Sequence, residues 1–210
     1  MSGSRLLAFS LASLAIIVVP GPSVLFVLAR GIAWGRGVAL ATVLGNTLGV
    51  FVLATAVAVG LGPVLTHAPT ATTVIEVVGG AYLIWLGVDA LRRRRAHAEA
   101  LASPDAARPS AGRAVRQGFV VGVANPKAVV FFVAVFPRFV EPSLGHVTVQ
   151  LLVLGLVFSC LALVSDGAWG LGAGAARDRL RRSPRLLVGL RTVGGVVMCG
   201  LGTLIVATAA

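Results

Sequence analysis

Two apolar stretches of this 210-residue sequence are interrupted in the same way: residues 18–26 read VVPGPSVLF, and residues 123–131 read VANPKAVVF. Proline has no backbone N–H and clashes with the preceding helical turn, so a helix breaks where it stands. It fits the first position of a new helix, directly after a capping residue such as Gly21 or Asn125. The sequence therefore predicts one broken helix in each half of the chain.

The composition is that of a membrane protein rather than a water-soluble domain. Hydrophobic residues make up 57% of the chain and charged residues only 12%, whereas about 25% charged residues is usual in soluble domains. A helix needs about 20 mostly apolar residues to cross a bilayer core of ~30 Å. Six stretches meet that requirement: 6–29, 38–61, 71–91, 117–139, 147–175 and 186–208. We therefore expect an all-α integral membrane protein with six transmembrane helices, of which the first and fourth are broken.

The arginines predict how these helices are oriented. Cytoplasmic loops of membrane proteins carry an excess of Lys and Arg. Loops one, three and five together carry fourteen arginines, while the other side carries Arg5 and Arg138. The fourteen are Arg30, Arg36, Arg92, Arg93, Arg94, Arg95, Arg108, Arg113, Arg116, Arg177, Arg179, Arg181, Arg182 and Arg185. These three loops are therefore expected in the cytoplasm, which places both termini outside.

The longest polar segment divides the chain. Residues 92–116 carry seven arginines and predict a basic cytoplasmic linker between a first membrane repeat, 1–91, and a second, 117–210. The four consecutive arginines at 92–95 are typical of an anchor to lipid phosphates rather than of a nucleic-acid site. The net charge of +11 is thus explained by membrane topology, with membrane lipid and no nucleic acid as the partner.

Matching features in the two halves predict an internal repeat. Gly79-Gly80 and Leu86-Gly87 in the third stretch correspond in order and spacing to Gly194-Gly195 and Leu201-Gly202 in the sixth. Each half contains three spans, an odd number, so the two halves enter the membrane in opposite senses. Two inverted three-helix repeats are an architecture of secondary transporters. Within the first repeat, Gly45 and Gly49 also predict a closely packed helix contact.

Two ionisable residues lie deep inside the predicted spans. Lys127 is the only lysine beside seventeen arginines, and Asp166 lies in the fifth span. An intramembrane charge costs at least about 2.5–3.5 kcal/mol and usually faces a partner or a water-filled path. At a rise of 1.5 Å per residue, both helix breaks, Asn46 and Asp166 fall about 12–15 Å from the cytoplasmic face. These features therefore share one depth, near the middle of the bilayer.

Their common depth predicts one binding site. Helix N-termini carry partial positive charge and favour carboxylates, and backbone groups freed at a break need partners because lipid offers none. A plain proline kink explains either break alone, whereas two breaks at matching positions favour a central site. The residues expected to bind substrate are Pro20, Gly21, Pro22, Asn46, Asn125, Pro126, Lys127 and Asp166. We assign no residue to a metal or a cofactor.

The sequence resembles the LysE/RhtB family of bacterial amino-acid exporters, in its homoserine/threonine-efflux branch. The resemblance covers nearly the whole chain, and its most specific elements are the Pro-Gly-Pro and Asn-Pro-Lys segments in this order. The other matching residues are Gly31, Gly35, Gly37, Gly45, Asn46, Gly49, residues 82–87, Phe131, Phe132, Pro137, Asp166, Trp169, Gly195, Leu201 and Gly202. Glu76 stands where the family has a lysine-like residue, and this departure bears on substrate preference.

The resemblance implies a multi-pass protein of the bacterial cytoplasmic (inner) membrane that exports an amino acid or a close derivative. Protons are the expected coupling ion and sodium the alternative, and a homodimer is the expected assembly. We hypothesise that the substrate carboxylate lies between the two helix N-termini and Lys127, while its ammonium group pairs with Asp166. A proton from outside would then protonate Asp166 and release the ammonium group.

Other functions have weaker support in the sequence. A cation exporter is expected to cluster Cys, Met, His or carboxylates inside the membrane, but Cys160 and Cys199 lie on different spans. An intramembrane protease needs a Ser–His pair, a zinc motif or two deep aspartates, and only Asp166 is clearly deep. We therefore expect no enzyme activity and no cofactor. Export of a cation or another small metabolite, and an intramembrane enzyme, remain the alternative functions.

Overall fold

The computed structural model describes residues 2–67, 69–93, 108–176 and 184–208, and every regular element in these ranges is a helix. The α-helices are α1 (Gly3–Val18), α2 (Pro22–Trp34), α3 (Arg36–His67), α4 (Pro69–Arg92), α6 (Ala111–Val123), α7 (Pro126–Val135), α8 (Val147–Ala175) and α10 (Pro184–Thr208). Two short 3-10 helices, η1 (Phe136–Phe139) and η2 (Pro142–Leu144), connect α7 to α8. The all-helical class expected from the sequence is confirmed for the described residues.

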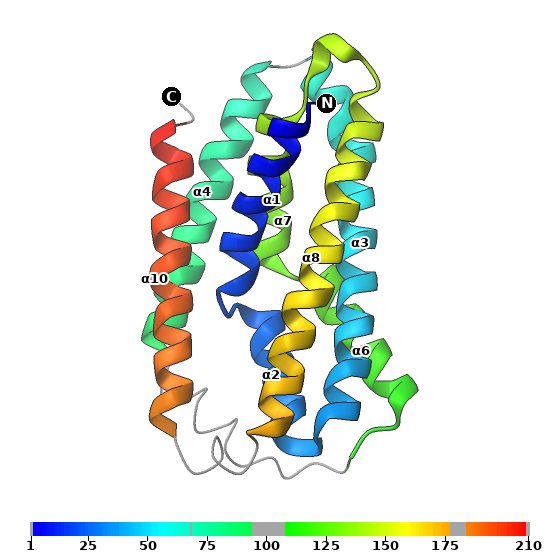
Figure 1. Cartoon of the computed structure of the whole chain (residues 1–210). Coiled ribbons are helices and arrows are strands. Elements are labelled where there is room, and N and C mark those ends of the chain that lie inside the picture. Colours follow the sequence, from blue (N-terminus) through cyan, green and yellow to red (C-terminus); the bar gives the residue numbers. More distant parts are fainter. Residues whose placement is uncertain (1, 68, 94–107, 177–183, 209–210) are drawn as a thin grey trace.

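The helices lie roughly parallel to one long axis (Figure 1). Four helices, α3, α4, α8 and α10, run most of the length of the molecule (Figure 1). The shorter helices α1 and α2 follow one another along that length, and so do α6 and α7 (Figure 1). Both chain ends lie at the same end of the bundle (Figure 1). Helices α4 and α10 pack along each other, and α3 packs along both α6 and α8.

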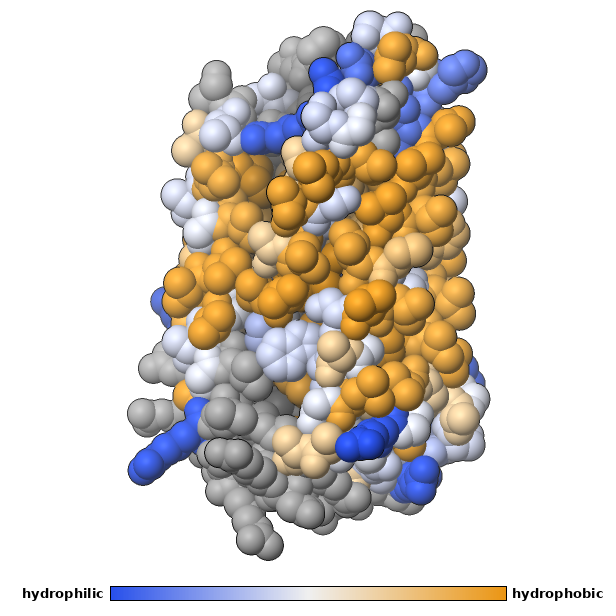
Figure 2. Space-filling model, viewed as in Figure 1, coloured by the Kyte–Doolittle hydropathy of each residue, from blue (hydrophilic) through white to orange (hydrophobic). Residues whose placement is uncertain are grey.

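The outer surface fits a lipid environment. Figure 2 shows an apolar band across the middle of this face, with hydrophilic residues toward the two ends. Within the described residues, α3 and α8 are each long and apolar enough to cross a membrane. The bent pairs α1–α2 and α6–α7 raise the number of such spans to as many as four. The structure therefore supports a multi-pass membrane protein, and six spans stay a prediction.

Two helix boundaries differ from the expected spans. Helix α6 begins at Ala111 rather than near residue 117, because Ser110 caps it by accepting a hydrogen bond from the Arg113 amide. Arg113 therefore lies on a helix and not in an extended linker. The first broken helix continues to Trp34 rather than ending near residue 29, because Gly35 terminates it with a positive φ of 85°.

The contact predicted for Gly45 and Gly49 is confirmed, and it lies between α3 and α6. A Cβ on Gly49 would lie 2.2 Å from the Phe119 carbonyl oxygen, so the two backbones touch. On the facing helix, a Cβ on Gly118 or Gly122 would lie equally close to a carbonyl oxygen of α3. These glycines thus hold α6 against the middle of α3.

The glycines that mark the two halves of the sequence face each other across α4 and α10. A Cβ on Gly80 would lie 2.9 Å from the Gly202 carbonyl oxygen, and one on Gly202 would lie 2.5 Å from the Gly80 carbonyl oxygen. Gly87 and Gly195 make the same reciprocal contact, at 2.6 and 2.9 Å. The contacts are therefore crossed: Gly80, which corresponds to Gly195, packs against Gly202, and Gly87, which corresponds to Gly202, packs against Gly195.

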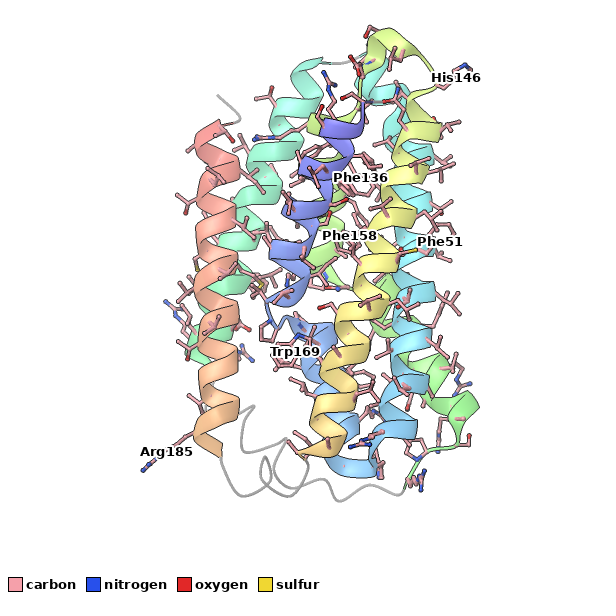
Figure 3. All side chains as sticks on the ribbon, in the orientation of Figure 1. Phe51, Phe136, His146, Phe158, Trp169 and Arg185 are labelled. Atoms are coloured by element: carbon pink, nitrogen blue, oxygen red, sulfur yellow. The ribbon has the colours of Figure 1, made fainter. Side chains whose placement is uncertain are left out.

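An aromatic cluster fills the core on one side of the helix breaks. Its rings are tilted or edge-on to one another at centroid distances of 4.6–6.4 Å and come from Phe9, Phe131, Phe132, Phe136, Phe139 and Phe158. Figure 3 shows Phe136 and Phe158 in the interior beside α1. Such pairs contribute about 0.5–1.5 kcal/mol each beyond the area they bury. The cluster fixes α7 and α8 relative to α1, and Phe158 borders the site described next.

Candidate functional site

The first helix break lies between α1 and α2, which meet at an angle of 51°. Helix α1 ends at Val18, and α2 begins at Pro22 with Gly21 as its N-cap. The predicted cap-then-proline arrangement is confirmed here. Gly21 supplies no side chain to cap α2, and the last carbonyl groups of α1 cannot bond within their own helix. Both helix ends at this break therefore need partners from elsewhere.

Lys127 supplies the partner for the end of α1. Its ammonium Nζ donates hydrogen bonds to the carbonyl oxygens of Ile16 and Val19, the latter at 2.7 Å. The side chain is 7% exposed and comes from the first turn of α7, more than a hundred residues away in sequence. An ammonium group has three donors, and its positive charge suits the negative end of a helix dipole. The lysine of one broken helix thus caps the other.

The second break, between α6 and α7, bends by 42° and is satisfied by its own residues. The Asn125 side-chain oxygen Oδ1 accepts a hydrogen bond from the Lys127 amide at 3.2 Å, which is the predicted N-cap with Pro126 as the first helical residue. The Ala124 and Asn125 amides donate back to the carbonyl oxygens of Val120 and Gly122. These three hydrogen bonds are all made between residues of α6, α7 and the break itself.

Asp166 lies on α8 at the level of the two helix breaks and is 4% exposed. Its Oδ2 accepts a hydrogen bond of 3.0 Å from the Asn46 amide nitrogen on α3. Asp166 and Lys127 line the same cavity, but the two side chains are not joined by a direct ion pair in the described part of the chain. A carboxylate and an ammonium group are therefore held apart, each by a separate partner.

A cavity of about 40 Å³ lies between these groups, with room for a few water molecules. Its polar lining comes from Gly21, Ser23, Asn46, Asn125, Lys127 and Asp166, and its apolar lining from Ile16, Ile17, Val24, Val50, Ala128, Phe158 and Ala162. The side-chain oxygens of Ser23 and Asn46 are buried and have no hydrogen-bond partner among the described residues. Buried polar atoms of this kind are rare in proteins, so the cavity is suited to a small polar ligand.

Comparison with known proteins identifies the family. Residues 14–209 match the family described as "LysE type translocator". The chain belongs to this family. The match confirms the resemblance seen in the sequence, and it indicates a transporter rather than an enzyme.

Two of three similar proteins carry the names of efflux proteins. A threonine efflux protein of Salmonella typhi is 34% identical over 67% of this chain and 69% of its own length. A leucine efflux protein of Klebsiella pneumoniae is 27% identical over 90% of this chain and 91% of its own. A Vibrio cholerae protein described as an uncharacterized membrane protein is 30% identical over 95% of both chains. No solved structure matches this translocator.

The structure brings five of the eight predicted site residues to one cavity of this translocator: Gly21, Asn46, Asn125, Lys127 and Asp166. Pro20 and Pro22 instead line a second cavity, of about 50 Å³, that touches the other side of Gly21 and includes Asp89. Pro126 begins α7 and lies in the lining of neither cavity. The two prolines and Pro126 therefore shape the backbone, and Gly21 alone borders both cavities.

Sequence reasoning missed Ser23, which stands two residues after Gly21, lines the cavity, and has a buried hydroxyl with no hydrogen-bond partner among the described residues. A hydroxyl residue directly after a break in an apolar helix was the available signal. The apolar wall formed by Phe158 and Ala162 gave no such signal, because apolar residues are abundant throughout these helices. The Glu76 side chain lies outside the described residues.

Proposed function

We propose that this translocator exports amino acids from the cytoplasm by proton antiport, through the cavity between its two helix breaks. The observation that carries the proposal is that Lys127 and Asp166, both buried, line the same cavity. A zwitterionic amino acid carries the complementary pair of charges. Export of an amino acid is further supported by the family and by the names of the threonine and leucine efflux relatives.

The binding mode follows from the donors and acceptors in the cavity. The substrate ammonium group is assigned to Asp166, with the unpartnered Asn46 oxygen as a second acceptor. The substrate carboxylate is assigned to Lys127 and to the N-terminus of α2, where the Ser23 hydroxyl lies. The first amides of a helix have no partner within it and favour an anion. Phe158 and Ala162 then face the substrate side chain.

Lys127 provides a switch in this proposal. The substrate carboxylate competes with the Ile16 and Val19 carbonyl oxygens for the Lys127 ammonium group. When the ammonium group turns toward the substrate, the end of α1 loses its cap, and α1 is free to move relative to α2. Since about 40 Å³ holds only a few waters, an amino acid requires such a movement in order to enter.

The conformational cycle is assigned to two inverted repeats of three spans. This assignment is supported by the reciprocal glycine contacts of α4 with α10, which join corresponding helices of the two halves. It is also supported by two matching sets of contacts: α3 packs against both segments of the second broken helix, α6 and α7, and α8 packs against both segments of the first, α1 and α2. Rocking of one repeat against the other exposes the cavity alternately to each side. The arginine-rich end is assigned to the cytoplasm.

Asp166 is assigned as the proton-coupling group. A proton arriving from outside neutralises the carboxylate, which weakens its attraction for the substrate ammonium group and releases the substrate there. Return of the protonated site to the cytoplasm delivers the proton, so one substrate leaves for each proton that enters. Asn46 holds the carboxylate in place during this exchange through its amide hydrogen bond.

Reconstituted protein tests the proposal. Proteoliposomes are loaded with the twenty common amino acids, and efflux is followed with a pH gradient, with a sodium gradient, and with neither. Selective loss of one or a few amino acids that depends on the pH gradient is expected, and Asp166→Asn is expected to abolish that dependence. Efflux that depends on the sodium gradient alone would contradict proton coupling. Efflux of no amino acid would contradict the proposed substrate class.

A further inference from the structure

Another hollow, larger than the two cavities described above, lies between α2 and α6. It is an open groove of about 610 Å³ lined by Phe26, Arg30, Arg116, Gln117, Val120 and Val121. Its lining residues lie within α2 and α6, two helices that contact each other and lie in the half of the bundle away from the N-terminal end of α1 (Figure 1). It shares no lining residue with the central cavity and has no part in the proposed transport step.

Arg30 is held in a fixed position at this groove. Its guanidinium carbon lies 4.5 Å from the centre of the Phe26 ring and 4.7 Å from that of Trp34. Its Nη2 also donates a 2.9 Å hydrogen bond to the Gln117 side-chain oxygen on α6. A guanidinium has five N–H donors in a planar fork, so donors remain after this bond. Arg30 is thus pre-organised for an oxyanion, the ligand that its fork matches best.

The opposite wall adds a second arginine and an apolar surface. Arg116 is exposed and lies one helical turn before Val120, which is 59% exposed although it is apolar. Phe26 and Val121 extend this apolar surface across the groove. Two cations at one end of an apolar trough match a molecule with an anionic head and a hydrocarbon tail. A small free anion would leave the apolar part of the trough uncovered.

We propose that this groove is a binding site for an anionic phospholipid of the leaflet at the arginine-rich end. The lipid phosphate lies between Arg30 and Arg116, and an acyl chain lies along Phe26, Val120 and Val121. Basic pockets between membrane helices on the cytoplasmic side are known to take such head groups. Because the groove joins α2 to α6, a bound lipid links the cytoplasmic halves of the two broken helices.

Native mass spectrometry of the full chain tests this site. The detergent-solubilised protein is titrated with phosphatidylglycerol, with phosphatidylcholine, and with glycerol 1-phosphate as a head group without acyl chains. Arg116→Gln removes one phosphate partner, and Arg113→Gln is the matched control, because Arg113 is exposed on the same helix and does not line the groove. Val120→Trp fills the trough without changing charge, and Val153→Trp on α8, 41% exposed in the wild type, is its control.

The expected result is retention of one phosphatidylglycerol in preference to phosphatidylcholine. Its affinity should fall about fivefold in Arg116→Gln, since one basic residue near a membrane surface contributes ~1 kcal/mol. Val120→Trp should also weaken it, while both controls stay within about twofold of the wild type. Equal losses in Arg113→Gln and Arg116→Gln would overturn the site in favour of unspecific charge attraction. Competition by glycerol 1-phosphate as strong as that of the lipid would overturn it in favour of a free-anion site.

Discussion

The two helix breaks look alike in sequence but are stabilised in different ways. The break between α6 and α7 is closed by its neighbours, with Asn125 capping α7 and two amides bonding back to α6. The break between α1 and α2 has no side-chain cap of its own, and the end of α1 is held by Lys127 from the second half of the chain. One break is self-contained, and the other depends on a charged group that can move.

This difference indicates which break responds to a ligand. A cap made by neighbouring residues changes only when the local backbone changes. A cap made by a flexible ammonium group is lost whenever a better anion competes for it. We therefore expect substitutions at the first break to affect export strongly, and substitutions at the second to affect mainly stability.

The largest effect is expected for Lys127→Met, which keeps an unbranched side chain one atom shorter and removes its donors. The Ile16 and Val19 carbonyl oxygens then lose their partner, at a cost of roughly 1–3 kcal/mol for each buried group. The variant also lacks the ammonium group that is proposed to bind the substrate carboxylate. Export in proteoliposomes should fall by at least about a hundredfold, as expected for loss of some 3 kcal/mol of interaction. Lys127→Met with wild-type export and wild-type unfolding free energy would contradict the difference between the breaks.

A smaller effect is expected for Gly21→Ala at the first break, which Lys127 caps from α7. The new Cβ would lie 2.9 Å from the Lys127 side-chain Cδ and would push the ammonium group away from α1. The Gly21 backbone is extended, with φ at −97°, so alanine adds no backbone strain there. Export should fall about tenfold, equivalent to ~1.4 kcal/mol, with little change in the unfolding free energy.

Gly167→Ala is the matched control for that variant. Gly167 is next to Asp166 on α8, and a Cβ there meets nothing within 4 Å. Replacing a helical glycine by alanine stabilises a helix by up to about 1 kcal/mol, so this variant should export normally and unfold no more easily than the wild type. Equal export by the Gly21→Ala and Gly167→Ala variants would show that Lys127 does not need its present position.

The smallest effect on export is expected for Asn125→Ala at the second break. It removes one capping hydrogen bond of 3.2 Å, which costs about 1 kcal/mol of stability. The unfolding free energy in detergent should fall by that amount while export stays within about threefold of the wild type. Asn125→Ser keeps a capping oxygen and should restore the stability. A loss of export in Asn125→Ala as large as that in Lys127→Met would show that the two breaks are equivalent.

Local sequence rules predicted both breaks, because proline and its capping residue act on their own backbone. The close contact of α3 with α6 was predictable in kind from Gly45 and Gly49, although the identity of the partner helix was not. The hydrogen bonds of the Lys127 ammonium group to the Ile16 and Val19 carbonyl oxygens could not be predicted from the sequence. Its acceptors are backbone carbonyls that every residue possesses, and they become special only where the tertiary fold leaves them unpaired. The hypothesis that Lys127 binds a substrate carboxylate therefore did not include its hydrogen bonds to the carbonyl oxygens of α1.

Binding of the amino acid that the proteoliposome assay selects, and of its analogues, most directly tests whether Lys127 and Asp166 divide the substrate between them. Isothermal titration compares that amino acid with its amide, which lacks the carboxylate, and with its deamino analogue, which lacks the ammonium group. Wild-type protein should prefer the amino acid to both analogues. Lys127→Met should lose the preference over the amide alone, and Asp166→Asn the preference over the deamino analogue alone. If both variants kept both preferences, or if wild-type protein bound the three compounds equally, the central cavity would not be the amino-acid site.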